Sequence, residues 1–220
     1  MRNGLSKPFC RVLDPIERIS EVLFGVIMAL TFTCTLGVAT ADNIKIKTML
    51  IGALGCNLAW GVIDGGVYLI ARIHALGRNI MTLRAMRAAA DTGAARRIVA
   101  DALPPLLASA LSEEQLEVIR RRLDHVPDAP ARPQLTKRDW LGALGVCLLC
   151  FLSTFPVAVP FLIVGDARMA LRASNAVAVT LLFCCGYAFG YRSGLSPWVT
   201  GLFMVAFAGA LVGVAIALGG

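Results

Sequence analysis

The stretch WLGALGVCLLCFLSTFPVAVPFLIV, residues 140–164, runs for 25 residues without a charged side chain. As a helix rising about 1.5 Å per residue, it reaches about 37 Å, more than the roughly 30 Å of hydrocarbon in a bilayer. Lipid offers no hydrogen-bond partner to a free backbone, so a single stretch that crosses it must be helical. This stretch therefore predicts a membrane-spanning helix.

Four more apolar runs lie on the two sides of this one, and short polar turns join neighbouring runs within each group. Runs joined by such short turns must be antiparallel. Glycines four residues apart, such as Gly186 and Gly190, would let helices approach closely, and a homodimer is the expected assembly. We predict an all-α polytopic membrane protein with five transmembrane helices at residues 19–41, 48–73, 140–164, 173–191 and 195–218.

The composition agrees with lipid as the solvent for much of the chain. Hydrophobic residues make up 57% and charged residues only 16%, and the mean hydropathy is +0.73. A soluble domain is normally about a quarter charged. We expect the first span to be retained, because residues that interrupt any apolar signal segment precede it. These residues are Pro8, Arg11, Asp14, Glu17 and Arg18.

The charges are mostly positive and unevenly placed. With the N-terminus inside, 16 of the 21 Lys and Arg lie in inner segments, Arg72 lies at the inner end of the second span, and four lie in outer loops. This bias predicts a cytoplasmic N-terminus, an outer C-terminus and a cytoplasmic middle segment. It also accounts for the net charge of +7 without a nucleic-acid partner. The Ala and Arg richness favours a bacterial inner membrane. The chain divides into residues 1–73, 74–138 and 139–220.

The middle segment is predicted to contain two helices. Leu76–Ala90 should continue the second span or lie along the headgroups, with a break at residues 103–105. Ser112 and Gln115 match a capping box that opens a second helix, which ends near Asp124. Prolines then predict an extended linker: Pro127, Pro130 and Pro133.

Seven cysteines raise the question of disulfides or a metal, but six of them lie inside apolar runs. There a thiol packs as a small hydrophobic group, without oxidising machinery beside it. Cys147 and Cys150 share a helix face, a spacing that would hold a soft metal only with a second ligand pair. We therefore expect packing roles and no tightly bound cofactor.

Asp64 is the one acidic residue deep inside a predicted span, and ionisable groups in lipid usually mark function. Asn57 and Gly61 share its helix face, seven and three residues earlier. A carboxylate, an amide and a glycine gap on one stripe resemble half of a cation or proton site. The alternative is structural, with Asp64 paired to a backbone group or to an inner arginine such as Arg72.

A second acidic pair, Glu17 and Glu21, stands at the mouth of the first predicted span. The two carboxylates face the same way, and their stripe continues through Met28, Thr31 and Thr35. Carboxylates, a thioether and hydroxyls would suit a borderline cation such as Fe²⁺ or Mn²⁺. The alternative is that acidic residues in a first turn stabilise the helix N-terminus.

A third acidic cluster, Glu113, Glu114 and Glu117, opens the second helix of the middle segment. Carboxylates on a cytoplasmic helix can collect divalent cations, and a solvated helix face is the other explanation. The sequence has no nucleophile elbow, phosphate-binding loop, dinucleotide fingerprint or zinc-protease motif. We therefore expect a protein that is not an enzyme.

Several stretches resemble the vacuolar iron transporter family. Residues 17–26 resemble its acidic entry followed by a glycine, and residues 57–69 resemble its glycine-rich second span. Pro156 and Pro160 resemble the proline pair of its third span, and residues 190–219 its last turn and span. The resemblance implies a five-span dimer that exchanges Fe²⁺ or Mn²⁺ for protons and collects metal on a helical segment between spans 2 and 3.

The same resemblance implies residue roles. Glu17 and Glu21 would be pore-mouth ligands, and Asn57 a pore position. Met28 would supply a soft ligand where the family carries an aspartate. The family also has an acidic residue at the position of Asn57 and a methionine at that of Gly65.

The sequence thus predicts a divalent cation transporter that exports Fe²⁺ or Mn²⁺ from the cytoplasm, with Asp64 as proton carrier. One alternative is a transport-inactive scaffold or regulator that docks lipid or a partner through its basic segment. Another is an anion transporter that depends on Arg168 and Arg172. The predicted metal ligands are Glu17, Glu21, Met28, Asn57, Asp64, Glu113, Glu114 and Glu117.

Overall fold

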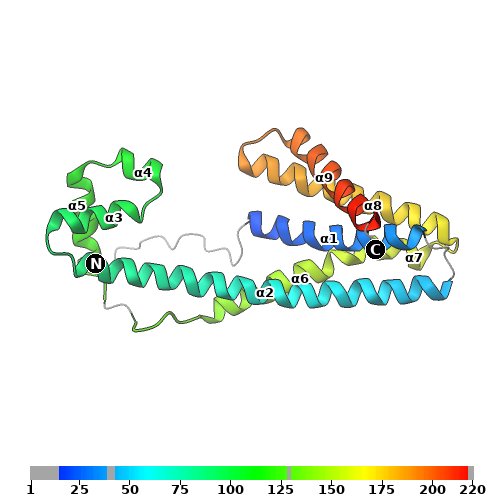
Figure 1. The fold of residues 1–220 in the computed structure, drawn as a ribbon, viewed down its shortest axis with the longest axis horizontal. Helices are drawn as coiled ribbons and strands as arrows, with labels where there is room; N and C mark the ends of the chain where they lie inside the picture. Colours follow the sequence, from blue (N-terminus) through cyan, green and yellow to red (C-terminus); the bar gives the residue numbers. More distant parts are fainter. Residues whose placement is uncertain (1–14, 39–42, 128–129, 218–220) are drawn as a thin grey trace, which may run out of the picture. The chain divides into compact units, whose positions relative to one another are not determined.

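The computed structural model describes residues 15–38, 43–127 and 130–217, and every regular element in these ranges is an α-helix (Figure 1). This confirms the all-α class. The helices are α1 (Pro15–Val38), α2 (Asn43–Arg87), α3 (Thr92–Asp101), α4 (Pro105–Ala110), α5 (Glu113–Asp124), α6 (Lys137–Leu152), α7 (Thr154–Ile163), α8 (Ala167–Ser193) and α9 (Pro197–Ala217).

Four helical stretches are long and apolar enough to cross a membrane, as the sequence predicted for four of its five spans. The remaining predicted span, residues 19–41, corresponds to α1, which continues to Val38. Several side chains of α1, and residues 39–42 that follow it, lie outside the described part. The four stretches are Leu50–Arg87, Lys137–Ile163, Ala167–Ser193 and Pro197–Val214.

The chain forms two compact units. The first, called unit 1, consists of residues 1–68 and 138–220, and the second, unit 2, consists of residues 69–137. The long helix α2 contributes its first part to unit 1 and its last part to unit 2. Each unit has its own buried apolar cluster and is described by itself.

The core of unit 1 is built around α8, which packs against α1, α7 and α9. Close approach of α8 and α9 depends on glycine, since a Cβ at Gly186 would lie 2.8 Å from the Thr200 carbonyl oxygen. Gly194 ends α8 in the left-handed conformation with φ 71°, which favours glycine. The buried core residues are Val26, Ala29, Leu30, Val157, Ala178, Leu182, Ala208 and Val212.

The stretch predicted as one continuous span at residues 140–164 is two helices, α6 and α7, which meet at Ser153. Pro156 explains the break, because its ring clashes with the carbonyl of Leu152 and it has no N–H to donate. The Ser153 hydroxyl donates to the Cys150 carbonyl oxygen at 2.7 Å. The proline therefore divides one apolar run into two helices.

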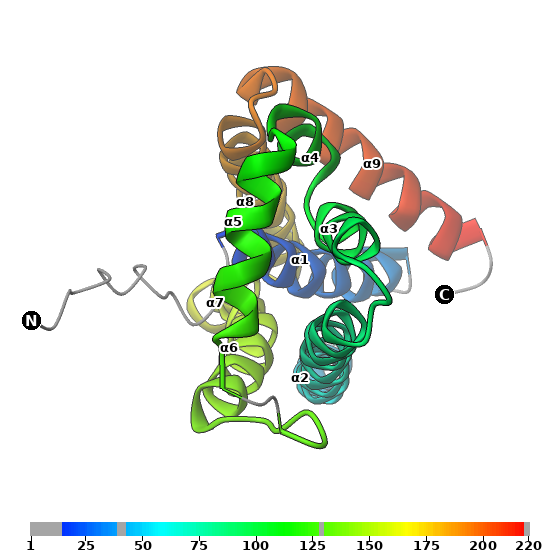
Figure 2. The same ribbon diagram turned by 90° about the vertical axis from the view of Figure 1, so that its left-hand side faces the viewer.

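Unit 2 packs the end of α2 against α3 and α5, which lie side by side (Figure 2). Met86, Ala95 and Val99 are buried in its centre. Both hydrogen bonds of the predicted capping box are confirmed. The Ser112 hydroxyl accepts from the Gln115 backbone N–H, and the Gln115 side-chain oxygen accepts from the Ser112 backbone N–H.

Two short helices of unit 2 were not foreseen. The helix predicted over Leu76–Ala90 ends at Arg87, and α3 begins after Asp91, whose carboxylate accepts from the Ala94 backbone N–H at 2.7 Å. This N-cap gives α3 its own start. Pro105 then occupies the first position of α4, where its missing N–H has no consequence.

Candidate functional site

A buried amide lies where three helices of unit 1 meet. The side chain of Asn57 on α2 is 0% exposed. Its Nδ2 donates to the Gly25 carbonyl oxygen of α1 at 3.0 Å and to the Thr154 hydroxyl of α7. Its Oδ1 is buried and accepts no hydrogen bond from any described residue. Asn57 thus holds α1 and α7 with its nitrogen and leaves a buried carbonyl oxygen open.

Glycines bring these helices close enough for the amide to reach. A Cβ at Gly25 would clash with the Cys150 carbonyl and the Ser153 side chain, and one at Gly61 would lie 2.7 Å from the Cys147 carbonyl oxygen. The Cys150 thiol also donates to the Asn57 backbone carbonyl at 3.7 Å. Side chains larger than hydrogen at the two glycines would force the backbones apart.

The contacts set α1 antiparallel to α2, since Gly25 meets Asn57 while Phe32 meets Gly52. One turn before Gly25 on α1 is Glu21, and one turn after Asn57 on α2 is Gly61, so these two lie at one level. The Glu21 side chain is half-buried there. Glu21 thus lies one helical turn from Gly25, whose carbonyl accepts from Asn57, and Asp64 lies two turns beyond Asn57 on α2.

Asp64 lies one turn beyond Gly61 and is half-buried. Its carboxylate makes no hydrogen bond or ion pair with any residue in the described part, so the considered pairing with Arg72 is not observed. Met28 on α1 is half-buried as well. Glu17 belongs to the first turn of α1, and its side chain lies outside the described residues.

Polar groups that the sequence did not single out complete the interior of unit 1. Thr154 is 2% exposed and bonds to Asn57. The buried hydroxyl of Thr33 on α1 donates to Asn175 Oδ1 on α8 at 3.0 Å. The Ser174 hydroxyl donates to the Val157 carbonyl oxygen at 2.6 Å. A hydroxyl or amide inside an apolar run was the available signal, but the run itself did not show which polar residue faces inward.

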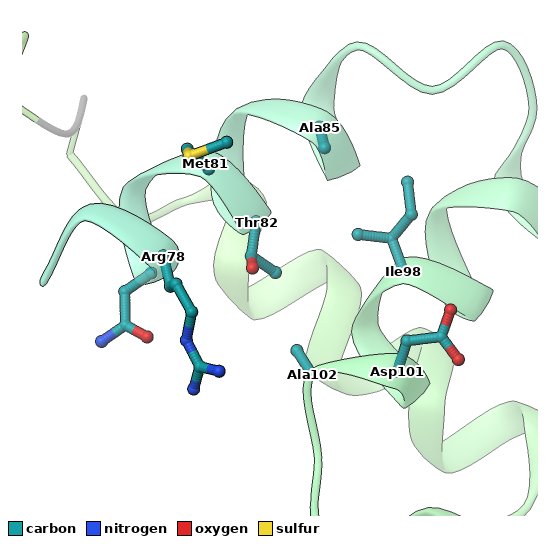
Figure 3. A pocket seen from close by; sticks show the side chains of 8 residues that line it. Arg78, Met81, Thr82, Ala85, Ile98, Asp101 and Ala102 are labelled. Atoms are coloured by element: carbon teal, nitrogen blue, oxygen red, sulfur yellow. The ribbon is translucent and has the colours of Figure 1, made fainter. Parts of the chain in front are cut away.

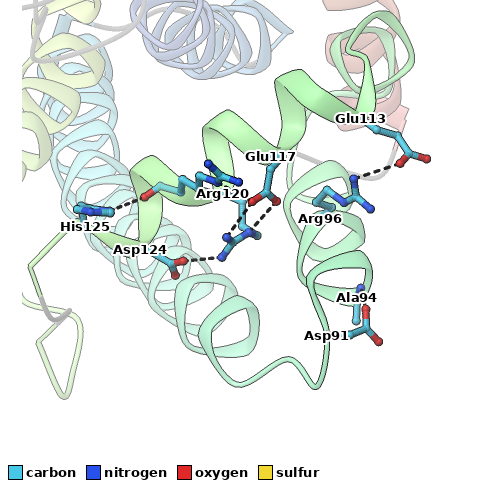
Figure 4. A network of polar contacts seen from close by, with 9 residues as sticks. Asp91, Ala94, Arg96, Glu113, Glu117, Arg120, Asp124 and His125 are labelled. Carbon is cyan, nitrogen blue, oxygen red and sulfur yellow. Dashed lines mark hydrogen bonds and ion pairs between the residues drawn. The ribbon is translucent and has the colours of Figure 1, made fainter.

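The acidic cluster of α5 lies in unit 2, and its carboxylates bind arginines (Figure 4). Glu113 pairs with Arg96 of α3 at 3.1 Å. Glu117 binds Arg120 and Arg121, each at 2.9 Å. Hydrogen bonds from Arg120 first and Arg121 second lower the pKa of Glu117 to about 2. These carboxylates are therefore drawn toward separate cationic partners.

Glu114 differs from its neighbours because its partner is neutral. Its carboxylate accepts from the Ser112 hydroxyl at 2.7 Å, and this hydrogen bond lowers the pKa of Glu114 below its ordinary value. Across the described residues, no three His, Cys, Asp or Glu side chains converge on one point that could hold a metal ion. The predicted ligands therefore form two separate groups, one around Asn57 and one on α5.

The sequence was compared with known proteins. No protein-family model matches it, and a search of the curated proteins finds no match. The resemblance to the vacuolar iron transporter family therefore rests on the stretches quoted above.

Proposed function

We propose that this protein carries a divalent cation, Fe²⁺ or Mn²⁺, out of the cytoplasm through five membrane-spanning helices in exchange for protons. The buried amide of Asn57 carries the proposal. Its Oδ1 is an open oxygen ligand in the interior of unit 1, and Glu21 lies one helical turn from Gly25, to which Asn57 bonds. A polar group buried among apolar helices and left without a donor is costly, so a transient cationic partner is a reason to retain it.

The cation path runs where α1, α2 and α6–α7 cross. A carboxylate and an amide oxygen are ligands of Mg²⁺, Ca²⁺ and Mn²⁺, and Fe²⁺ accepts them with a softer donor. Met28, one turn beyond Gly25 on α1, supplies such a donor. The glycine contacts at Gly25 and Gly61 keep the path narrow, which favours a bare or partly dehydrated ion.

Asp64 is the proton carrier in this scheme. It is half-buried and pairs with no Lys, Arg or His side chain of the described part, so it can take up and release a proton. Its position one turn from Gly61 puts it near the cation path without making it a fixed ligand. The excess of Lys and Arg in the inner segments orients the N-terminus and unit 2 toward the cytoplasm. The assembly is a homodimer, as the family resemblance implies.

The test is Mn²⁺ uptake by proteoliposomes that contain the full-length protein, with Fe²⁺ as a second substrate. Asn57→Ala should lower uptake at least about tenfold, because a lost oxygen ligand weakens ion binding by about 1.4 kcal/mol or more. Asn175→Ala is the matched control: it removes an amide that bonds to Thr33 and lies outside the path. Asp64→Asn should make uptake insensitive to a pH gradient. Wild-type uptake by both Asn57→Ala and Asp64→Asn would rule the mechanism out.

A second function, a scaffold or regulator without transport, is favoured by one observation. Glu113 and Glu117 on α5 are bound by arginines, and Glu114 by a serine, so a metal would have to displace these partners. The two functions differ in their response to metal. Stabilisation of the purified protein by Mn²⁺ or Fe²⁺ supports transport, whereas no shift with Mn²⁺, Fe²⁺ or Zn²⁺ supports the scaffold.

A further inference from the structure

A groove in unit 2 lies between the last turns of α2 and the end of α3 (Figure 3). Its volume is about 480 Å³, which falls in the range of small-molecule sites. Arg78, Asn79 and Thr82 line it from α2, and Asp101 lines it from α3. Its apolar lining includes Met81 and Ile98. The groove therefore offers both charged and apolar contacts to one ligand.

The two charges of the groove are available. Neither Arg78 nor Asp101 makes an ion pair or side-chain hydrogen bond with any described residue, and Arg78 is exposed. Two arginines further along α2 differ: Arg84 donates to the Pro130 and Ala131 carbonyl oxygens, and Arg87 donates to three carbonyls at the end of α5. Arg78 and Asp101 line one groove without pairing with each other. A ligand with both a negative and a positive group would satisfy both side chains.

The place of Arg78 along α2 indicates where such a ligand comes from. Arg78 follows Ile73, the last residue of the apolar run, by five residues on one continuous helix, a rise of about 7.5 Å. The polar headgroup layer beyond the hydrocarbon is about 5–7 Å thick on each side. Met81 is 69% exposed beside it, an apolar side chain available to a lipid. The backbone of Arg78 therefore lies at the outer edge of the headgroup layer, and its long side chain can reach back to a lipid phosphate.

We propose that this groove binds the headgroup of phosphatidylethanolamine. Arg78 pairs with the phosphate, with Asn79 and Thr82 as further donors, and Asp101 pairs with the primary ammonium. Phosphatidylglycerol lacks a cation for Asp101, and the quaternary ammonium of phosphatidylcholine has no N–H to donate to it. The site is independent of cation transport.

The experiment measures lipid retention by the full-length protein in detergent, by native mass spectrometry. Phosphatidylethanolamine, phosphatidylglycerol and phosphatidylcholine with identical acyl chains are added in turn. The wild type should retain phosphatidylethanolamine in preference to the other two. Arg78→Ala and Asp101→Asn should each lower that retention about tenfold, because each removes a charge-assisted contact.

Arg97→Ala is the matched control, since Arg97 is exposed on α3 and does not line the groove. It should retain the lipid as the wild type does. Amide exchange of α3 in each variant verifies that unit 2 stays folded. Free phosphoethanolamine should compete with the lipid, which shows that the headgroup is recognised. Equal retention of all three lipids, or unchanged retention by Arg78→Ala and Asp101→Asn, would overturn the proposal.

Discussion

Unit 1 and unit 2 use polar side chains in opposite ways. In unit 1 a single amide, Asn57, is fully buried and its Nδ2 holds helices α1 and α7. In unit 2 several ion pairs, such as Glu117 with Arg120 and Arg121, form near the surface of one helix. Ion pairs that water can reach contribute little individually, whereas a polar group away from water interacts strongly and is costly when unpaired. The number of polar contacts is therefore a poor guide to where function lies.

The two units also differ in how they pack. In unit 1 helix backbones touch at glycines such as Gly25 and Gly61, with little side-chain volume between them. In unit 2 a small cluster around Met86 separates the helices. A substitution should therefore destabilise unit 2 when it removes volume and unit 1 when it adds volume. The predictions below test this difference.

The largest expected effect is that of Met86→Ala. The side chain is 3% exposed at the centre of the unit 2 core, so its loss should lower the stability of that unit by about 2–5 kcal/mol. Amide hydrogen exchange in the full-length protein should show faster exchange in α3 and α5. Met81→Ala, at an exposed position on the same helix, is the control and should leave these amides protected. Equal exchange in both variants would show that unit 2 does not depend on its apolar core.

A somewhat smaller effect is expected from Gly61→Val in unit 1. The added Cβ would lie 2.7 Å from the Cys147 carbonyl oxygen, and such overpacking typically costs about 1–3 kcal/mol. Gly66→Val makes the same change on the same helix, where a Cβ meets nothing within 4 Å. Thermal unfolding in detergent should separate the two variants. The idea of backbone contact fails if Gly66→Val is as unstable as Gly61→Val.

The smallest effect concerns pH and the ion pairs of α5. The pKa of Glu117 is about 2 in the folded protein, below the ordinary value of 4.5, so its ionised form stabilises unit 2 above pH 4.5. This contribution should disappear as the pH falls from about 4.5 to 2. Exchange of the α5 amides, corrected for intrinsic rates, should show the loss, and Glu117→Gln should reduce it. A Glu117→Gln profile identical to that of the wild type would contradict the assigned pairing.

Parts of the fold that depend on neighbouring residues were predictable. The apolar runs predicted five spanning helices, four of which are long and apolar enough to cross a membrane in the described part, and Ser112 with Gln115 predicted the start of α5. The cap at Asp91 was equally local and was overlooked, so α3 was missed. Pro156 likewise marked the break between α6 and α7. These features depend on contacts within a few residues, where the sequence pattern is direct evidence.

The candidate site was only partly predictable. Asn57, Glu21 and Asp64 were singled out because polar groups are rare inside apolar runs. Their arrangement was not predictable, since Asn57 bonds to Gly25 and to Thr154, 32 and 97 positions away. The binding of the α5 carboxylates by arginines from α3 and α5 was also missed, and it bears directly on the metal hypothesis.

By itself, the sequence determined that this chain is helical, that four stretches are apolar enough to cross a membrane, and where several helices begin. Only the tertiary structure decided which face of each helix points inward. On α2, Asn57 and Gly61 are buried while Val62 and Ile63 are exposed. Lipid is as apolar as a protein interior, so the pattern of apolar residues along a spanning helix does not distinguish its packed face from its lipid face. Contacts between distant residues make that distinction.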